Sequence, residues 1–366
     1  MRKSVVGAAA RVLLLLLLLV LALILTASRW ILSAIALMIV LPLISWGLNF
    51  YVRNHIKAGV TMPTTIAKNT AVPVTVELRN DSLLPVLKAF CTLRIHNDLT
   101  GEERTVTLSD SVGAGQRSSQ SFLLESEFCG QLHVPVSSVT LMDCFGLLPV
   151  KARVEASARM TVLPDLFPVE AEISARTSDQ EEGSADRKGE DRSEVFQLRE
   201  YQPGDDVRQI HWKLSSKLDE MILKEPSAPQ SRSVMVFWDK RFPGTPAQMD
   251  TLAEAVSSVC QGILEGGMPF RLCWTEGEEL MLSEVADDNE LLLAIPALVK
   301  TVGVPECRLP DMEEYSSILY FTSELPETGD LSRIHVMLCS DSEESHDTLT
   351  VFSPQDYREV LQRLEM

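Results

Sequence analysis

The hydrophobic and polar positions divide the chain into zones with different periods. The first zone holds two almost purely apolar runs, 12–28 and 30–50, separated by Arg29. A helix rises about 1.5 Å per residue and the hydrocarbon layer is about 30 Å thick, so each run is long enough, or nearly so, to span a membrane. Hydrocarbon offers no partner for backbone groups, so both runs are predicted to be helices joined by a tight turn at Ser28 and Arg29.

The basic residues around these runs predict their orientation. By the positive-inside rule, both ends of the hairpin and the soluble part face the cytoplasm, at the cell (cytoplasmic) membrane. The bases flanking the outer ends of the runs are Arg2, Lys3, Arg11, Arg53 and Lys57. The alternative is a cleaved signal peptide, but the segment 25–28 is a poor cleavage site and a second span follows at once.

The second zone, residues 59–168, alternates polar and apolar positions in short β-prone runs separated by turn signals. This pattern predicts an antiparallel β-sandwich of the immunoglobulin-like or fibronectin-like kind, which usually binds or spaces and seldom catalyses. The predicted strands are 72–78, 87–95, 104–108, 120–124, 131–136, 139–142 and 159–162.

Residues 169–194 lose apolar positions and become rich in Asp, Glu, Ser, Gly and Arg. Such a composition buries too little surface to offset the entropy of ordering, so we predict an acidic flexible linker. A regulatory phosphorylation site or docking tail is the alternative interpretation.

The last zone, 195–366, alternates continuous apolar strands with helical periods, which predicts an α/β domain with a parallel sheet covered on both faces. A final helix is predicted to open at Ser353-Pro354-Gln355-Asp356. The predicted strands are 221–224, 233–238, 270–274, 317–322, 334–339 and 348–352, and the predicted helices before the last are 248–265 and 289–299.

Charge changes this picture in one respect. The chain carries a net charge of −18, but the first 58 residues hold six bases and no acid, which leaves −24 for the remainder. A soluble part that acidic is repelled by nucleic-acid phosphates and by anionic headgroups, so nucleic acid is excluded and proteins or cations are the expected partners.

Cysteine and histidine usage predicts no catalytic, cofactor-binding or metal-binding residue. The cysteines are odd in number and form no CxxC pair, which predicts buried free thiols in a reducing compartment, with a disulfide framework or zinc site as the alternative. No histidine spacing indicates metal ligation or a nucleophile with its base. The seven cysteines are Cys91, Cys129, Cys144, Cys260, Cys273, Cys307 and Cys339.

The densest cluster of turn, cap and aromatic residues lies at 195–213. Pro203-Gly204 predicts a turn, Asp205 a helix N-cap, and Asp206 a favourable charge at the helix start. One face of the predicted helix, which extends to about Ser216, is apolar. Arg208, Lys213 and Lys217 point away from that face, toward carboxylates or a partner.

This segment resembles the signature of the bacterial domain-of-unknown-function 58 family. Its matching residues are Arg199, Glu200, Tyr201, Pro203, Gly204, Asp205, Asp206, Arg208, Ile210, Trp212 and Lys213. Asp143 with 145–147 resembles the Asp-x-Phe-Gly-Leu end of the family's β-rich module. Many members have Ala-Arg where this chain has Ser216-Lys217, which leaves any role of that arginine in doubt.

The resemblance implies a membrane hairpin, a β-rich module and a C-terminal domain similar to von Willebrand factor A. Family members are encoded beside MoxR-type AAA ATPases and transglutaminase-like membrane proteins, so these are the implied partners. In the A-type fold a metal is often held by Asp-x-Ser-x-Ser after the first strand. Here that position reads Asp239-Lys240-Arg241-Phe242-Pro243, which poorly supports an oxygen cage even if Thr322, Ser323 and Glu324 contribute.

Three functions remain as hypotheses. The first is a non-catalytic, membrane-anchored interaction or scaffold protein, in which the signature is either a partner interface or a structural element with Tyr201 and Trp212 packed between the soluble domains. The second is a metal-dependent adhesion-type domain with a degenerate site at Asp239. The third is a cell-envelope enzyme, although the sequence has no nucleophile elbow, P-loop, dinucleotide loop or metal motif.

Overall fold

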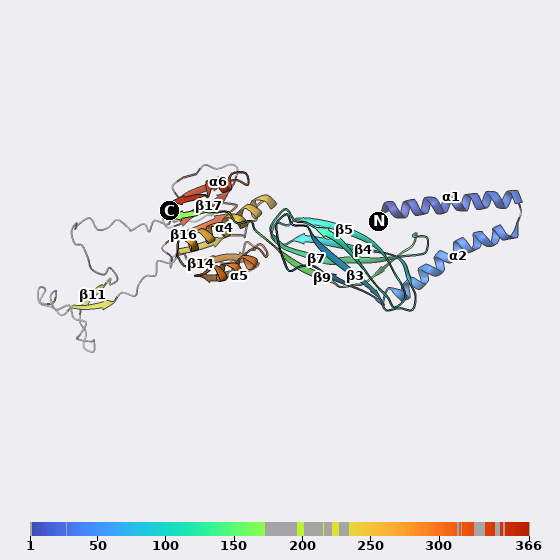
Figure 1. Cartoon of the computed structure of the whole chain (residues 1–366), viewed down its shortest axis with the longest axis horizontal. Helices are drawn as coiled ribbons and strands as arrows, with labels where there is room; N and C mark the ends of the chain where they lie inside the picture. Colours follow the sequence, from blue (N-terminus) through green and yellow to red (C-terminus); the bar gives the residue numbers. More distant parts are fainter. Residues whose placement is uncertain are drawn as a thin grey trace.

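The computed structural model describes residues 2–26, 28–172, 196–200, 215, 222–226, 234–312, 315, 317–325, 334–340, 345–346 and 348–365. A pair of helices, a β-sandwich and an α/β domain follow one another along the long axis of the molecule (Figure 1).

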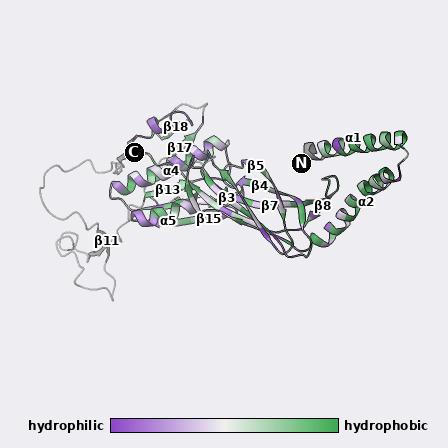
Figure 2. Ribbon diagram, turned by 45° about the vertical axis from the view of Figure 1, so that its right-hand side comes forward, coloured by the Kyte–Doolittle hydropathy of each residue, from purple (hydrophilic) through white to green (hydrophobic). Residues whose placement is uncertain are grey.

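The helical pair consists of α1 (Arg2–Thr26) and α2 (Arg29–Val52), which pack against each other. Both are long and apolar enough to cross a membrane, and their ribbons are almost continuously hydrophobic (Figure 2). The first helix begins ten residues earlier than the predicted run and includes Arg11, whose guanidinium donates to the Gly7 carbonyl one turn before it. Arg29 is the first residue of α2 and so lies outside the turn in which it was predicted.

The β-sandwich pairs one sheet of order β1-β3-β6 with another of order β2-β9-β7-β4-β5, and β8 joins the edge of β7. Every pairing is antiparallel except that of β2 with β9. The side chains of Val74, Leu93, Val134 and Leu141 fill the space between the sheets and are fully buried. The strands are β1 (Ile56–Thr61), β2 (Thr65–Ala67), β3 (Val72–Asn80), β4 (Val86–Asn97), β5 (Glu103–Val112), β6 (Arg117–Leu124), β7 (Gly130–Met142), β8 (Pro149–Ala152) and β9 (Ser157–Leu163).

Two features of the sandwich differ from the sequence prediction. Its first strand starts at Ile56, three residues before the predicted boundary and almost directly after α2. The predicted strands 131–136 and 139–142 form one strand, β7, because a register shift opposite Thr92 and Leu93 leaves Ser137 as an extra residue. A bulge of this kind bends a strand without ending it.

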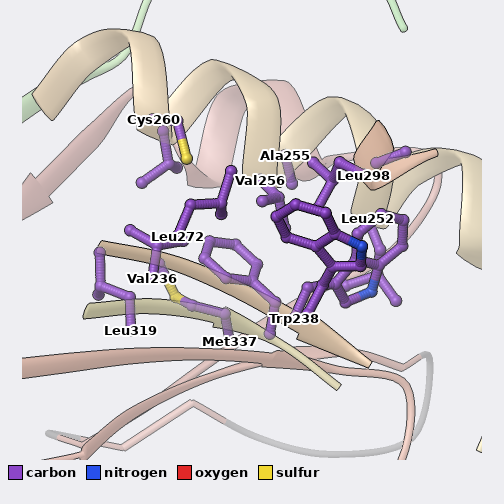
Figure 3. Packing of buried hydrophobic residues seen from close by; sticks show 14 of the residues in the cluster. Val236, Trp238, Leu252, Ala255, Val256, Cys260, Leu272, Leu298, Leu319 and Met337 are labelled. Atoms are coloured by element: carbon purple, nitrogen blue, oxygen red, sulfur yellow. The ribbon is translucent and has the colours of Figure 1, made fainter. Parts of the chain in front are cut away.

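The α/β domain contains a sheet of order β15-β14-β13-β16-β17-β18, in which only β15 runs antiparallel to its neighbour. Helices α4 (Pro246–Glu265) and α5 (Asp288–Leu298) pack on the same face, where Trp238 and Val236 point toward Val256 of α4 (Figure 3). Tyr315, with partly buried Leu309 and Met312, packs on the other face. The strands are β13 (Val234–Trp238), β14 (Phe270–Glu276), β15 (Glu279–Val285), β16 (Ser317–Thr322), β17 (Ile334–Cys339) and β18 (Leu349–Phe352).

The ends of the predicted linker and of the chain differ from expectation. Residues 170–172, predicted to be flexible, form β10 (Glu170–Glu172), which pairs in parallel with β19 (Arg363–Glu365). Burial of Phe167 and Val169 against α4 holds this segment in place. The predicted final helix is only α6 (Tyr357–Val360). The Asp356 carboxylate accepts from the backbone and hydroxyl of Ser353 at the predicted helix start.

The sandwich and the α/β domain meet in a mixed apolar and polar junction at α4. Leu99 and Cys129 of the sandwich belong to the same buried cluster as the apolar face of α4. Beside them, the Lys68 ammonium contacts the Asp250 carboxylate at 2.6 Å and the Glu254 carboxylate at 2.5 Å. Asp250 also accepts the backbone N–H of Cys129 at 2.7 Å. Lys68 of the sandwich therefore pairs with two carboxylates of the α/β domain, and Asp250 also accepts a backbone N–H of the sandwich.

Burial and ion pairing shift the pKa values of the charged groups in this junction in opposite directions. Burial by itself disfavours the charged forms, but the hydrogen bonds between Lys68 and the two carboxylates outweigh it, so the pKa of Lys68 is raised and that of Glu254 is lowered. Tyr357 and Arg358 also donate to Glu254, whose side chain is fully buried. Because the pKa of Glu254 is lowered on folding, its contribution is present above the ordinary carboxyl pKa and is lost as the pH falls through the lowered value.

Replacing Lys68 should weaken the whole molecule. In Lys68→Ala, Asp250 and the fully buried Glu254 lose a shared cation, and breaking a buried pair in this way costs about 3–5 kcal/mol. Lys57→Ala is the matched control, because Lys57 forms an ion pair with Asp81 but its side chain is 70% exposed, and such pairs contribute about 0–1 kcal/mol. The measurement is urea unfolding of the full-length protein in detergent. Equal losses of unfolding free energy in the two variants would contradict the stabilising role of the junction.

Candidate functional site

The predicted signature segment is flanked in the sequence by two strands that pair with each other. Strand β11 (Phe196–Glu200) pairs antiparallel with β12 (Ile222–Pro226), so Arg199 lies opposite Leu223 and Glu200 opposite Ile222. Ser215, near the predicted end of the helix, is helical and buried. The other signature residues lie outside the described part of the chain: Tyr201, Pro203, Gly204, Asp205, Asp206, Arg208, Ile210, Trp212 and Lys213.

The strand order creates a second candidate site where β13 and β16 lie side by side. The chain leaves β13 toward β14 on one side, while the later strands β16, β17 and β18 continue on the other side. In open α/β sheets a ligand crevice forms at such a point, outside the carboxyl ends of the strands. Asp239 directly follows β13, and Thr322 ends the adjacent β16, with Ser323 and Glu324 just beyond it. The sequence had singled out these same two segments as possible metal ligands.

At this strand end the Asp239 carboxylate is engaged by neighbouring side chains. The Arg241 guanidinium donates to both carboxylate oxygens, with Nη2 2.7 Å from Oδ2, and the Tyr320 hydroxyl donates to Oδ2 at 2.6 Å. The hydrogen bond to Asp239 raises the pKa of Arg241, and burial together with the Asp239 charge raises the pKa of Tyr320. Arg241 therefore supplies the positive charge that a divalent cation would bring to this carboxylate.

Thr322, the last residue of β16, and the two residues after it form a turn beside the loop that follows β13. Thr322 Oγ1 donates to the Glu324 carbonyl at 2.8 Å and accepts the Glu324 N–H. Ser323 Oγ donates to the Phe242 carbonyl at 2.5 Å. These contacts fasten the loop after β13 to the end of β16, which is a structural use of residues predicted as possible ligands.

Lys240 turns in the opposite direction from Arg241, into the protein interior. Its side chain is fully buried, and Nζ donates to the carbonyls of Leu298 at 2.8 Å and Thr301 at 2.6 Å, near the end of α5. The ammonium also lies 5.2 Å from the centre of the Trp238 ring. Burial lowers the pKa of Lys240 to about 7, with Glu276 opposing the shift and Lys300 adding to it.

The arrangement as a whole is suited to holding loops together. Within the described ranges, no group of three or more His, Cys, Asp or Glu side chains is placed to hold a metal ion. All seven cysteines are free, and six are buried while Cys144 is exposed. Sequence reasoning missed Tyr320 and the Lys68 junction. Asp250 and Glu254, four residues apart among the apolar positions at the start of α4, were the signal that could have revealed the junction.

The buried amine of Lys240 should give the protein a distinctive pH dependence. Between pH 7 and 10.5 the unfolded chain holds a proton on Lys240 that the folded protein has released, so the free energy of unfolding rises with pH in this window, by up to about 1.4 kcal/mol per pH unit. Lys240→Met should remove this rise. Urea unfolding of the two proteins from pH 6 to pH 11 measures it. The prediction would be contradicted if the unfolding free energies of the two proteins changed with pH in the same way.

Divalent cations should not stabilise the crevice while Arg241 occupies Asp239. We expect calorimetric titration of the full-length protein with Mg²⁺, Mn²⁺ and Ca²⁺ to give no saturable heat from this site. Asp239→Ala distinguishes a signal here from binding elsewhere, because a saturable heat that disappears in this variant would support the adhesion-type alternative.

Comparisons with known proteins add a family to these observations. A family model described as "Protein of unknown function DUF58" matches residues 197–260, from β11 through the signature segment into α4. No curated protein matches the sequence.

Similar solved structures align with about a third of the chain. A CARDB domain from Pyrococcus furiosus, solved with di-metal ions, is 12% identical, covers 30% of this chain and 87% of its own, and has a TM-score of 0.22. A PapD-like domain of human CEP192 gives the same identity, coverage and TM-score. The Pseudomonas fluorescens alkylpurine DNA glycosylase AlkC is 18% identical over 35% of this chain and 42% of its own, with a TM-score of 0.19.

Scores this low carry no argument about fold or function, so the family model is the informative comparison. The resemblance predicted from the signature is thereby confirmed: through residues 197–260, the family model supports placing this chain in the DUF58 family of proteins of unknown function.

Proposed function

We propose that this protein is a non-catalytic, membrane-anchored scaffold that presents its α/β domain and signature segment to a protein partner. The observation that carries the proposal is the serial arrangement of the molecule, in which α2 leads almost directly into β1 and the far end of the sandwich joins α4 through a buried ionic junction (Figure 1). Because the sandwich is joined directly to α2 at one end and by buried ion pairs to α4 at the other, it holds the α/β domain at a defined distance from the helices.

The α/β domain is of the von Willebrand factor A type in this proposal. Its support is the strand order β15-β14-β13-β16-β17-β18, with an antiparallel strand at one edge and the others parallel. The crevice at the carboxyl ends of β13 and β16, where ligands usually bind in open α/β sheets, is occupied by Asp239, Arg241 and Tyr320. This contact favours a binding platform over a metal-dependent adhesion site or an enzyme.

The soluble part faces the cytoplasm in this proposal, and the partner is a MoxR-type AAA ATPase, with a transglutaminase-like membrane protein as a further component. The orientation rests on the bases that flank the two helices, and on the hairpin, which returns the chain to the side from which it started. The partners rest on what the DUF58 family implies, and they are compatible with an acidic, membrane-held platform.

The partner can be tested by affinity capture of the tagged full-length protein from native membranes, with and without ATP, read by mass spectrometry. We expect a nucleotide-sensitive AAA ATPase in the eluate. Arg208→Ala and Lys213→Ala should reduce its recovery without changing the urea unfolding midpoint, whereas Arg104→Ala, which removes an exposed base of the sandwich, should change neither.

The other results have definite meanings. Loss of folding in the Arg208 and Lys213 variants would show that the signature is structural. An eluate that contains only envelope enzymes or their substrates would contradict the ATPase partner.

A further inference from the structure

The sandwich touches α2 well before that helix ends. Ser45 Oγ accepts the backbone N–H of Cys144 at 3.1 Å, and Asn49 Nδ2 donates to the Met142 carbonyl at 3.0 Å. Ser45 precedes the last residue of α2 by seven positions, which is about 10 Å along a helix. The connection between β7 and β8 therefore lies beside the last two turns of α2, on the side facing the helices (Figure 1).

The same two turns carry aromatic residues that suit a membrane–water interface. Trp46 and Phe50 pack edge to face with ring centres 4.9 Å apart, and the Arg53 guanidinium lies 4.9 Å from the Phe50 ring centre. Tyr51 is exposed beside them. Trp and Tyr concentrate where apolar rings meet headgroups, so this belt marks the depth that the β7–β8 connection reaches.

The β7–β8 connection is built to tolerate a poorly hydrated environment. The buried Asp143 carboxylate accepts the backbone N–H groups of Phe145 at 3.0 Å, Leu147 at 2.5 Å and Leu148 at 2.6 Å. Its carbonyl accepts the N–H of Gly146, which has a φ of +74° that suits glycine. Backbone donors that would be costly to bury without partners are thus satisfied inside the loop.

A second apolar loop lies at the same end of the sandwich. The Asp81 N–H donates to the His55 carbonyl just after α2, which places the connection between β3 and β4 next to the helix end. Leu83 of this connection is 86% exposed, and Leu87, at the start of β4, is 58% exposed. Asn80 donates to the Leu84 carbonyl, so the loop presents its leucines without unpaired polar groups at its base.

The charge at this end is opposite to that of the soluble part as a whole. We define the membrane-proximal end as 53–57, 81–88, 113–117 and 143–151. Its bases are Arg53, Lys57, Lys88, Arg117 and Lys151, and its acids are Asp81 and Asp143. Asp81 pairs with Lys57 and Arg79, and Asp143 is buried. Arg117 pairs with Glu77, which lies outside these segments. With five bases and two acids, the membrane-proximal end has a formal charge of +3 next to the helix, whereas residues 59–366 together carry −24.

We propose that the membrane-proximal end of the sandwich is itself a bilayer-binding surface: the β7–β8 connection and the Leu83–Leu87 loop enter the interfacial layer beside α2, and the surrounding bases bind anionic lipid headgroups. The occupant is lipid because the surface is continuous with a candidate membrane span and shares the depth of its aromatic belt. This binding fixes the tilt of the sandwich on the bilayer, which a two-helix anchor alone does not.

Cys144 provides a natural reporter, since it is exposed and the other six cysteines are buried. The full-length protein, labelled there with a polarity-sensitive maleimide fluorophore, is reconstituted into vesicles containing phosphatidylglycerol. In a Cys144→Ser background, Leu83→Cys reports on the second loop. Leu123→Cys is the matched control, because Leu123 is a 70% exposed leucine at the opposite end of the sandwich, paired with Pro73.

We expect labels at 144 and 83 to be quenched by lipids spin-labelled near the headgroup and to be several-fold less sensitive to aqueous acrylamide than the label at 123. Acrylamide sensitivity equal to that at 123 would overturn the proposal. Because Leu83→Cys replaces an exposed side chain, its result stands even if labelling at 144 disturbs the contact with Ser45.

The headgroup preference has a separate test. Lys88→Gln with Lys151→Gln removes two exposed bases of the membrane-proximal end. Lipid quenching at position 83 should fall in phosphatidylglycerol vesicles to the level seen with phosphatidylcholine alone. Quenching that is the same in both lipids and in both proteins would overturn the recognition of anionic headgroups and leave apolar insertion as the only interaction.

Discussion

The pairing of Lys68 with Asp250 and Glu254 is the constraint on which the arrangement of the soluble part depends. Two carboxylates on the buried face of α4 would be costly without cations, and Lys68 of the sandwich is the cation that both of them share, while Arg358 of the α/β domain pairs with Glu254 alone. Apolar contacts of Leu99 and Cys129 with α4 exclude water around the pair and strengthen it. The sandwich and the α/β domain therefore share both an ion-paired cluster and a buried apolar cluster at α4, and separating them would expose both.

The other end of the sandwich is joined to the helices by different means. There the backbone passes almost directly from α2 into β1, and the hydrogen bonds of Ser45 and Asn49 to the β7–β8 connection add lateral contacts. The sandwich is thus in contact with its neighbours at both ends, which is the arrangement on which the proposed scaffold role and the proposed lipid contact near α2 both depend.

In the α/β domain, internal contacts occupy the carboxyl ends of β13 and β16, where open α/β sheets usually bind ligands. Arg241 and Tyr320 satisfy Asp239, while Lys240 ties the same loop to the end of α5. A neutral amine at Lys240 can make both of its hydrogen bonds without the cost of burying a charge, which agrees with its lowered pKa. With Asp239 engaged in this way, our proposal assigns partner recognition to the signature segment between β11 and β12, which lies within the part of the chain that the DUF58 model matches.

Local pattern alone determined the two apolar helices, the continuous buried strands such as 317–322 and 334–339, and the turn-rich alternation of the sandwich, because each depends on a period read over neighbouring residues. The tertiary structure decided which charges meet. Lys68 and Glu254 are 186 positions apart, Tyr320 and Asp239 are 81 apart, and Ser45 and Cys144 are 99 apart. It also turned the expected linker start into β10, by pairing it with the C-terminal β19. A sequence period records which face of an element is buried, whereas the partner on that face depends on how distant elements pack.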